Sequence, residues 1–288
     1  MKNEGPYLKE WLEFHRMVGV EHFYLYDNDS TDETPTVISP YVLKGDITIH
    51  YWPVHPVQHK AYMHCITSYR DESFWIAFID LDEFLIPVAA PSLPEFLRDF
   101  EQYGGVGVNW LMYGNSGHAV RPQGLQIENY IYRADASWKS NRHIKSIANP
   151  RLVRSPRNPH CFRYVKGAGA VNENREPVEG SLTTANTTQK IRINHYFTRS
   201  TEESRIKMER GNPDSNFKRP WNDFVRLNRN DVRDSIMEQY IESEQAKQLS
   251  YAEPQDEYVC IRCRNKVELV IDGICLRCSN ELDTQEQK

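Results

Sequence analysis

The sequence predicts an α/β protein whose mostly parallel sheet is covered by helices. Three observations lead to this prediction. Segments with helical and strand patterns alternate between residues 4 and 111, as in proteins with parallel sheets. Two of the expected strands end abruptly in acidic residues, and 39% of the 288 residues are hydrophobic, which is enough for a sizeable core.

The first expected helix covers residues 4–18, where apolar side chains recur about every 3.6 residues. Pro6 suits its start and Gly19 its end. Residues 22–26 form an apolar, aromatic run typical of a buried strand. The next expectations are a helix before Gly45, a strand over 46–51, a helix over 58–70, a strand over 74–79, a helix over 93–103 and a strand over 106–111.

The second half is less regular. Residues 113–200 contain many Gly, Pro and Asn residues, so we expect a loop-rich region that carries specificity. Residues 201–211 and 231–250 are polar and favour helix. We therefore divide the chain into a domain over 1–230, a polar helical spacer over 231–255 and a small module over 256–282.

One absence stands out at the N-terminus. An open sheet that binds a nucleotide normally begins with a strand, whereas the first helix here starts almost at Met1. A missing first strand is therefore an open alternative for this fold.

Charge and hydropathy limit the partners. The formal net charge is only −5 and both signs are interleaved, so neither a nucleic acid nor an acidic membrane is indicated as the main partner. No stretch approaches the roughly 18 apolar residues that a membrane span needs, and the N-terminus lacks the apolar core of a secretory signal. We expect a cytoplasmic protein, with peripheral membrane contact left open.

Acidic residues follow two of the expected strands. Asp27 ends the first strand, and Asp80 and Asp82 follow the apolar run 74–79. Because open α/β sheets bind ligands at the carboxyl ends of their strands, these side chains should converge on one crevice. An Asp-x-Asp pair suits a hard divalent cation, which would neutralise a diphosphate leaving group. Taken alone, the triplet more often marks a helix-capping turn.

The order of several motifs resembles glycosyltransferase family 92 and related family-2-like enzymes. The resemblance covers roughly residues 3–211 and rests on the stretches Asn3-Glu4-Gly5-Pro6-Tyr7-Leu8-Lys9-Glu10-Trp11, Gly19 to Ser30, Trp75 to Leu85, Gly114-Asn115-Ser116-Gly117-His118, Lys145-Ser146-Ile147 and His195-Tyr196-Phe197-Thr198-Arg199-Ser200. It implies a GT-A (Rossmann-like) fold and an inverting transfer from a nucleotide sugar. The implied donor is a UDP-sugar, with UDP-galactose as one candidate, and the implied cofactor is Mn²⁺ or Mg²⁺.

The resemblance also implies roles for individual residues. Glu4 and Asp27, with Asp29 beside it, would face the nucleoside, Asp80 the ribose and metal, and Asp82 the metal directly. His195 is a candidate third metal ligand, although a histidine satisfied by structural hydrogen bonds is almost as good an interpretation.

Basic and glycine-containing segments complete the expected donor site. Lys145, Lys207 and Arg210 could pair with the diphosphate, and each could equally be a solvated surface charge. Gly117 and His118 lie in a loop suited to a close approach to a sugar on the acceptor side, or in an ordinary turn.

An inverting transfer needs a general base for the acceptor hydroxyl. Asp135, Glu173 and Glu176 lie in the expected acceptor half, and we take Glu173 as the candidate. Surface carboxylates are the default interpretation of all three.

Four cysteines near the C-terminus form two knuckles, Cys260-x-x-Cys263 and Cys275-x-x-Cys278. Two such knuckles supply the sulfur set of a structural Zn²⁺ site, so residues 256–282 are expected to form a zinc ribbon outside the family pattern. Two disulfides are the alternative. Cys65 and Cys161 are expected to be buried small side chains.

The motifs and the family that they resemble together imply an inverting, metal-dependent enzyme that moves a hexosyl group from a UDP-sugar to a glycan hydroxyl. The alternative is a non-catalytic protein, either a degenerate glycosyltransferase or an adaptor whose zinc ribbon binds a partner.

Overall fold

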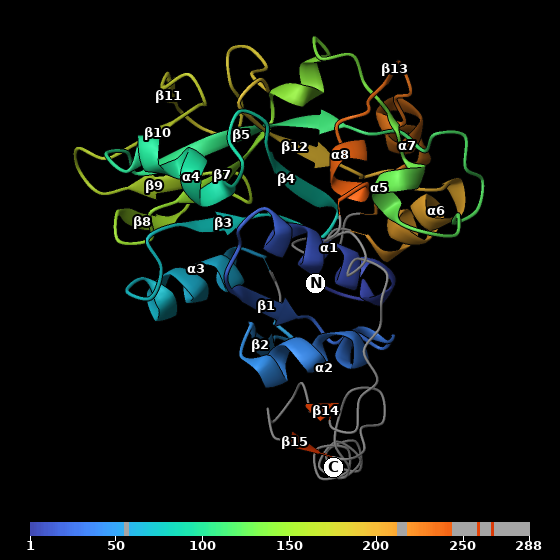
Figure 1. The fold of residues 1–288 in the computed structure, drawn as a ribbon, viewed down its shortest axis with the longest axis horizontal. Coiled ribbons are helices and arrows are strands. Elements are labelled where there is room, and N and C mark those ends of the chain that lie inside the picture. The colour runs from blue at the N-terminus through green and yellow to red at the C-terminus, as the bar shows by residue number, and fades with distance from the viewer. Residues whose placement is uncertain (55–57, 212–217, 244–257, 260–265, 268–288) are drawn as a thin grey trace.

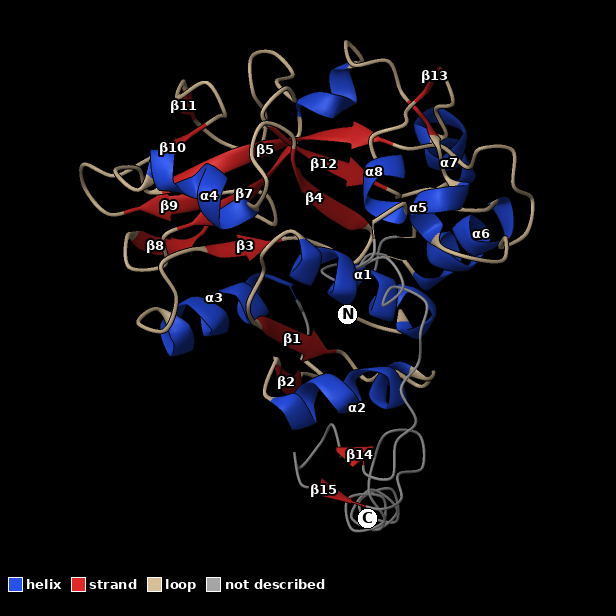
Figure 2. Ribbon diagram, viewed as in Figure 1, coloured by secondary structure: helices blue, strands red, loops and turns tan. Residues whose placement is uncertain are grey.

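The computed structural model describes residues 1–54, 58–211, 218–243, 258–259 and 266–267. The molecule has a mixed α/β fold, with one large sheet and the smaller two-stranded sheet of β1 and β2 beneath it (Figures 1 and 2). The helices are α1 Gly5–Met17, α2 Thr34–Lys44, α3 Gln58–Tyr69, α4 Leu93–Leu97, α5 Gln126–Asn129, α6 Thr201–Arg210, α7 Trp221–Leu227 and α8 Glu238–Ile241, with 3-10 turns η1 Arg98–Phe100 and η2 Lys139–Arg142. The strands are β1 Phe23–Asp27, β2 Ile47–Tyr51, β3 Ile76–Phe78, β4 Glu83–Pro87, β5 Gly105–Met112, β6 Tyr132–Arg133, β7 Ile144–Ala148, β8 Val153–Pro156, β9 Phe162–Tyr164, β10 Ala170–Val171, β11 Pro177–Val178, β12 Ile191–His195, β13 Val232–Arg233, β14 Tyr258–Val259 and β15 Lys266–Val267.

Local sequence explains the helices of the first half. Helix α1 begins beside Pro6 and buries its apolar face, including Leu8, Leu12 and Phe14, in the main core. Helix α2 ends at Gly45, whose φ of 82° gives the left-handed cap that glycine adopts most easily. The expected helices of the first half are thus confirmed, although the one expected over 93–103 is shorter and finishes as the 3-10 turn η1.

The expectation of a mostly parallel sheet is wrong. In the seven-stranded sheet β5 pairs in parallel with β10 and β12, while the other four pairings, β10–β11, β12–β4, β3–β7 and β5–β7, are antiparallel. Strands β1 and β2 are parallel but form a separate two-stranded sheet. Strands β7 and β12 come from residues 113–200, the region that was expected to be rich in loops.

Residues 231–243 lie against the domain rather than leading away from it. Strand β13 pairs with β6, and the Asp234 carboxylate accepts a hydrogen bond from Arg192 at 2.9 Å. The ring of Tyr240 in α8 packs edge-on against Phe14 of α1. In the described part of the expected polar helical spacer, the short helix α8 is the only helix, and strand β13 precedes it.

Candidate functional site

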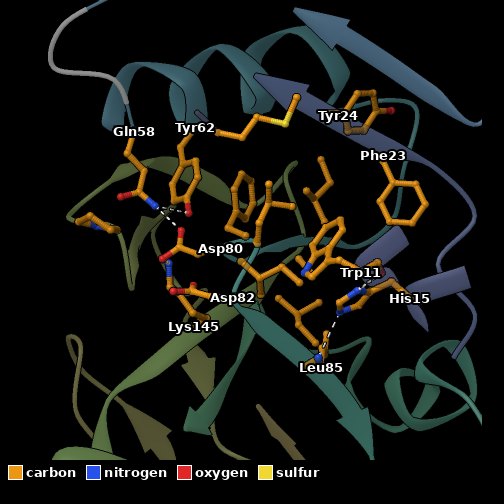
Figure 3. Close-up of a pocket in the computed structure, with 18 of the residues that line it drawn as sticks. Trp11, His15, Phe23, Tyr24, Gln58, Tyr62, Asp80, Asp82, Leu85 and Lys145 are labelled. Atoms are coloured by element: carbon orange, nitrogen blue, oxygen red, sulfur yellow. Dashed lines mark hydrogen bonds and ion pairs between the residues drawn. The ribbon is translucent and has the colours of Figure 1, made fainter. Parts of the chain in front are cut away.

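A cavity of about 1810 Å³ lies between α1, β1, α3 and β3 (Figure 3). Seven of the residues that were singled out from the sequence line it, namely Glu4, Asp80, Asp82, Lys145, His195, Lys207 and Arg210.

The loop between β3 and β4 carries the two aspartates. It is closed by Glu83, whose carboxylate accepts the backbone N–H of Asp80 at 2.8 Å and whose own N–H donates to the Asp80 carbonyl at 3.0 Å. The Glu83 side chain is fully buried, and burial raises its pKa well above the usual range, aided by the charges of Asp80 and Asp82 and opposed by Lys145. Asp80 and Asp82 thus leave the strand end on a tight, defined turn.

Asp80 is held from two sides. Lys145 of β7 donates to its carboxylate at 2.8 Å, and Gln58 of α3 donates at 2.6 Å (Figure 3). The Lys145 ammonium is buried. Burial acts to lower its pKa, but the Asp80 and Glu83 carboxylates outweigh it and hold that pKa well above the usual range. Lys145 is therefore a permanent positive charge beneath Asp80, whose side chain keeps 40% of its surface exposed.

Asp82 faces a second pair of side chains. Lys207 of α6 donates to its carboxylate, and His195 Nε2, at the end of β12, lies 3.5 Å from its other oxygen. Burial acts to raise the pKa of Asp82, but the charge of Lys207 and the contact with His195 outweigh it and hold that pKa well below the usual range. Burial lowers the pKa of His195, which Asp82 opposes. Asp82 is thus an anion beside a neutral imidazole.

A third cluster connects the N-terminal helix to the same loop. The Glu4 carboxylate accepts from Arg199 at 3.0 Å and from Arg210 at 3.2 Å. Arg199 also donates to the carbonyl of Leu81 at 3.4 Å, and its guanidinium stacks 3.8 Å from the Tyr7 ring centroid. Glu4 therefore contacts protein cations through both of its oxygens.

The residues around Asp82 can be tested against the expected divalent cation. Within the described ranges, no group of three or more His, Cys, Asp or Glu side chains is arranged to hold a metal. The residue types would suit such an ion, because carboxylates and a neutral imidazole bind divalent cations. The nitrogen of His195 that faces Asp82 is Nε2, whereas the unpartnered Nδ1 lies 3.9 Å from the buried Glu83. Asp82 and His195 would form the nucleus of the site once Lys207 moves off Asp82.

Two residues predicted to bind the donor do not line the cavity. The Asp27 carboxylate is buried and accepts the backbone N–H of Ser30 at 3.2 Å; burial raises its pKa, which the hydrogen bonds from Ser30 oppose. Asp29 is exposed, has a φ of 61° and accepts a hydrogen bond from the Tyr51 hydroxyl. Neither side chain is brought to Asp80.

The acceptor-side candidates also lie elsewhere. Gly117 and His118 belong to a loop that packs against the start of α6, where the His118 carbonyl accepts the N–H of Thr201 at 3.1 Å. Asp135 is exposed, and its carboxylate accepts a hydrogen bond from the backbone N–H of Ser137. The Glu176 carboxylate accepts a hydrogen bond from the side-chain amide of Asn172. None of these four residues lines the cavity.

Glu173 has a structural environment that argues against a role as the base. Its buried carboxylate accepts three backbone N–H groups, from Gln189, Lys190 and Ile191, at 2.8 to 2.9 Å. It thereby fixes the turn that leads into β12, away from the cavity, and both of its oxygens are already hydrogen-bonded to the backbone.

Sequence reasoning missed several cavity residues. Gln58 and Tyr62 come from α3, and Trp110, His143 and His160 form an aromatic group next to His195. Polar and aromatic residues of these types give no local signal. Arg199 lay within one of the resembling motifs, so its role could have been inferred there.

The four C-terminal cysteines, Cys260, Cys263, Cys275 and Cys278, lie outside the described residues. Cys65 and Cys161 are buried free thiols, as expected. Among the residues that the structure describes, none of the helices has the length and apolar character needed to cross a membrane.

A family model described as glycosyltransferase family 92 matches residues 3–245. The chain belongs to glycosyltransferase family 92. This family 92 chain is 32% identical to a glycosyltransferase family 92 protein of Ricinus communis over 185 residues, which are 60% of the chain and 33% of the relative. It is 27% identical to a family 92 protein of Oryza sativa subsp. japonica over 177 residues, 60% of the chain and 30% of the relative.

A galactan beta-1,4-galactosyltransferase of Arabidopsis thaliana is also similar to the family 92 chain. It shares 25% identity over 200 residues, which are 59% of the chain and 38% of that protein. The chain spans about a third of the length of these curated relatives. The expected family is confirmed by the match to the family model.

Proposed function

We propose that the family 92 chain is a metal-dependent, inverting glycosyltransferase that moves a hexosyl group from a UDP-sugar to a glycan hydroxyl. The arrangement of Asp80 and Asp82 carries this proposal, because two carboxylates leave one turn into a large cavity and each faces a lysine. The similarity to galactan beta-1,4-galactosyltransferases supports galactose as the sugar. The GT-A class of fold remains part of the proposal.

Different residues of the site would bind the metal ion and the diphosphate of the donor. Asp82 and His195 would hold the Mn²⁺ or Mg²⁺, which when bound supplies Lewis-acid stabilisation of the leaving phosphate. Lys207 and Arg210 lie on α6 beside the carboxylates that they now contact, so their charges are placed to turn to a diphosphate instead. Lys145 would stay buried and orient the partly exposed Asp80, which would contact the ribose and the metal.

Donor turnover tests the proposal directly. Purified protein with Mn²⁺ and a panel of UDP- and GDP-sugars should hydrolyse or transfer at least one donor, and Asp82→Asn should reduce that rate by about a hundredfold or more. The matched control is Asp99→Asn, since Asp99 is exposed and pairs with the exposed Arg175 at 3.3 Å. Absence of donor binding and turnover, or an Asp82→Asn rate equal to that of the control, would contradict the proposal.

A non-catalytic function is the second candidate. It is favoured by one observation, namely that the charges of Asp82 and Glu4 are already neutralised by protein cations. Such a protein would bind a UDP-sugar in calorimetry without consuming it. Turnover by the wild-type chain excludes this candidate.

We also propose the structural Zn²⁺ site at Cys260, Cys263, Cys275 and Cys278 on the spacing of its ligands alone. Metal analysis should find close to one zinc per chain. A metal-free protein with four additional titratable thiols would overturn this assignment.

A further inference from the structure

The backbone of Met1 is paired with β1. Its amino group donates to the carbonyl oxygen of Tyr26 at 2.7 Å, and its carbonyl oxygen accepts the N–H of Asn28 at 2.8 Å. A residue that bonds to positions 26 and 28 in this way stands opposite Asp27 in a parallel ladder. Met1 therefore occupies the place of the last residue of a strand that runs parallel to β1.

This ladder is on the edge of β1 that faces away from β2. Phe23 and Asp27 direct their backbone groups to β2, as the bonds from Phe23 N to Asp46 O and from Trp52 N to Asp27 O show. Backbone groups alternate between the two edges along a strand, so residues 24, 26 and 28 point the other way. The cavity lies on that side, because β1 residues 23–26 line it.

Strand β3 lines the side of the same cavity that lies opposite β1. Residues 74–79, which include all of β3, line it, and β3 pairs with β7 on its other edge. Strands β1 and β3 belong to different sheets, and among the described residues no strand lies between them. Figure 3 shows Phe23 and Tyr24 at one end of the cavity and Asp80, Asp82 and Lys145 at the other.

The walls of the cavity are apolar on two sides. Trp11, Leu85 and Leu93 line it from α1, β4 and α4, whereas Ala61, Tyr62 and Cys65 line it from α3. A strand between β1 and β3 would be covered by both walls, as strands are in the middle of an open α/β sheet. The slot therefore suits a continuous apolar run rather than one that alternates with polar residues.

We propose that the slot between β1 and β3 is the binding site of one extended apolar segment, namely the stretch of polypeptide joined directly to Met1 in a longer form of this chain. The segment runs parallel to β1 and joins the two sheets into one. Side chains of paired residues in a parallel sheet point to the same face. Hence the residue directly before Met1 stands opposite Tyr26 and faces α3, and the one before it stands opposite Leu25 and faces α1.

The proposal is independent of the proposed function and is tested without any donor. One form of the full chain carries five Val and Ile residues directly before Met1, and a matched form has Asp-Pro at the third and fourth of these five positions. The apolar extension should raise Tm by roughly 5–10 °C and slow amide exchange at Tyr24 and Ala77. The Asp-Pro extension should do neither, since proline breaks the ladder and aspartate is costly in an apolar slot.

A cross-link keeps the proposal testable if thermal unfolding proves irreversible. Cys65 lies in the α3 wall, so a cysteine at one of the α3-facing positions of the extension should form a disulfide with Cys65 when diamide is added as the oxidant. Cysteines at the α1-facing positions should not. Peptide mapping identifies the pair among the other thiols.

Three results would overturn the proposal. The first is equal Tm and exchange for the apolar and Asp-Pro forms. The second is cross-linking to Cys65 that does not depend on the facing of the introduced cysteine. The third is that the apolar pentapeptide, added in trans at equimolar concentration, protects Tyr24 and Ala77 as well as the fused segment does, which would assign the slot to a separate partner strand.

Discussion

The guanidinium group of Arg199 lies 3.4 Å from the backbone carbonyl oxygen of Leu81, the residue between the two cavity aspartates. The same group donates to Glu4 at 3.0 Å and to Gln126 at 2.7 Å, and it stacks on Tyr7. Its nitrogens thus link the first helix, α5 and the Asp-Leu-Asp loop. Arg199 positions the loop without being a candidate to touch the reacting atoms.

Arg199→Lys should weaken the site although the charge is retained. An ammonium group cannot reach Glu4, Gln126 and Leu81 together, because only the planar fork presents donors in those directions. We expect a loss of about 2 kcal/mol in the free energy of unfolding, measured in urea, and a drop of about tenfold in donor turnover. Arg121→Lys is the matched control, since the exposed Arg121 stacks on the same Tyr7 ring at 4.6 Å. Equal effects at the two positions would contradict the assignment.

Lys145→Met should be among the most destabilising single changes in this domain. It leaves the buried Glu83 carboxylate without the ammonium 3.7 Å away and removes the 2.8 Å bond to Asp80. Breaking a buried pair in this way costs about 3–5 kcal/mol.

Glu83→Gln tests the reason for that loss. In the double variant no carboxylate is left buried without its cation at this position, so at least about 1 kcal/mol should be recovered relative to the sum of the single changes. Urea unfolding of all four proteins closes the cycle. Strict additivity would show that Glu83 and Lys145 do not interact.

Stability should rise with pH in a window set by His15. This buried imidazole contacts the Trp11 carbonyl through Nδ1 at 2.8 Å and accepts the N–H of Leu85 on Nε2 at 3.2 Å, so it is held neutral. Burial lowers its pKa from 6.5 to about 4, opposed by the bond to Trp11. Below pH 6.5 the unfolded chain takes up a proton that the folded chain refuses until about pH 4, and the stabilisation is lost as pH falls through this window.

The effect of His15 should reach about 3 kcal/mol across that range. The measurement is the free energy of unfolding between pH 4 and 7 for the wild type and for His15→Gln, whose side chain can still accept from Leu85. The variant should show a shallower slope. His160, whose pKa burial also lowers to about 4, leaves a residual slope in both proteins. Parallel curves for the two proteins would rule out the assignment to His15.

Glu173→Gln should separate stability from catalysis. The amide keeps one acceptor oxygen and turns an NH₂ group toward backbone donors, so we expect about 2–3 kcal/mol of destabilisation. Donor turnover at a temperature where the variant is folded should stay within about twofold of the wild type, because the carboxylate lies away from the cavity. The exposed Glu179→Gln provides the stability control. A loss of turnover without a loss of stability would restore Glu173 as the base.

Much of the fold of the first half could be predicted from the sequence, and the central antiparallel strands could not. Helices α1 and α2 have buried apolar faces and clear start and end signals. Strand β12 alternates Ile191 and Ile193 with Arg192 and Asn194, yet all four are buried. The charge of Arg192 is matched by Asp234, which lies 42 residues further along the chain, and no local pattern reveals such a partner.

The site, too, could be predicted only in part, because the sequence shows which residues follow a strand but not which distant residues they contact. Asp80 and Asp82 follow an apolar strand, and their position was visible in the sequence. Asp27 was expected beside them because the ends of adjacent parallel strands converge, but β1 and β3 lie in different sheets. Its carboxylate turns back to Ser30 instead. The contacts of Lys145, His195 and Lys207 depend on pairings between distant strands and helices, which only the structure supplies.

The pairing of β4 with β12 places Glu83 directly opposite His195, and the loops that hold the aspartates and Arg199 both leave from this last rung. Inserting one residue into either strand would turn every following side chain to the opposite face. The aspartates and the imidazole would then no longer meet. Natural variation in chain length should therefore gather in the loops between residues 113 and 190, while the five-residue spans of these two strands stay constant in length across the family.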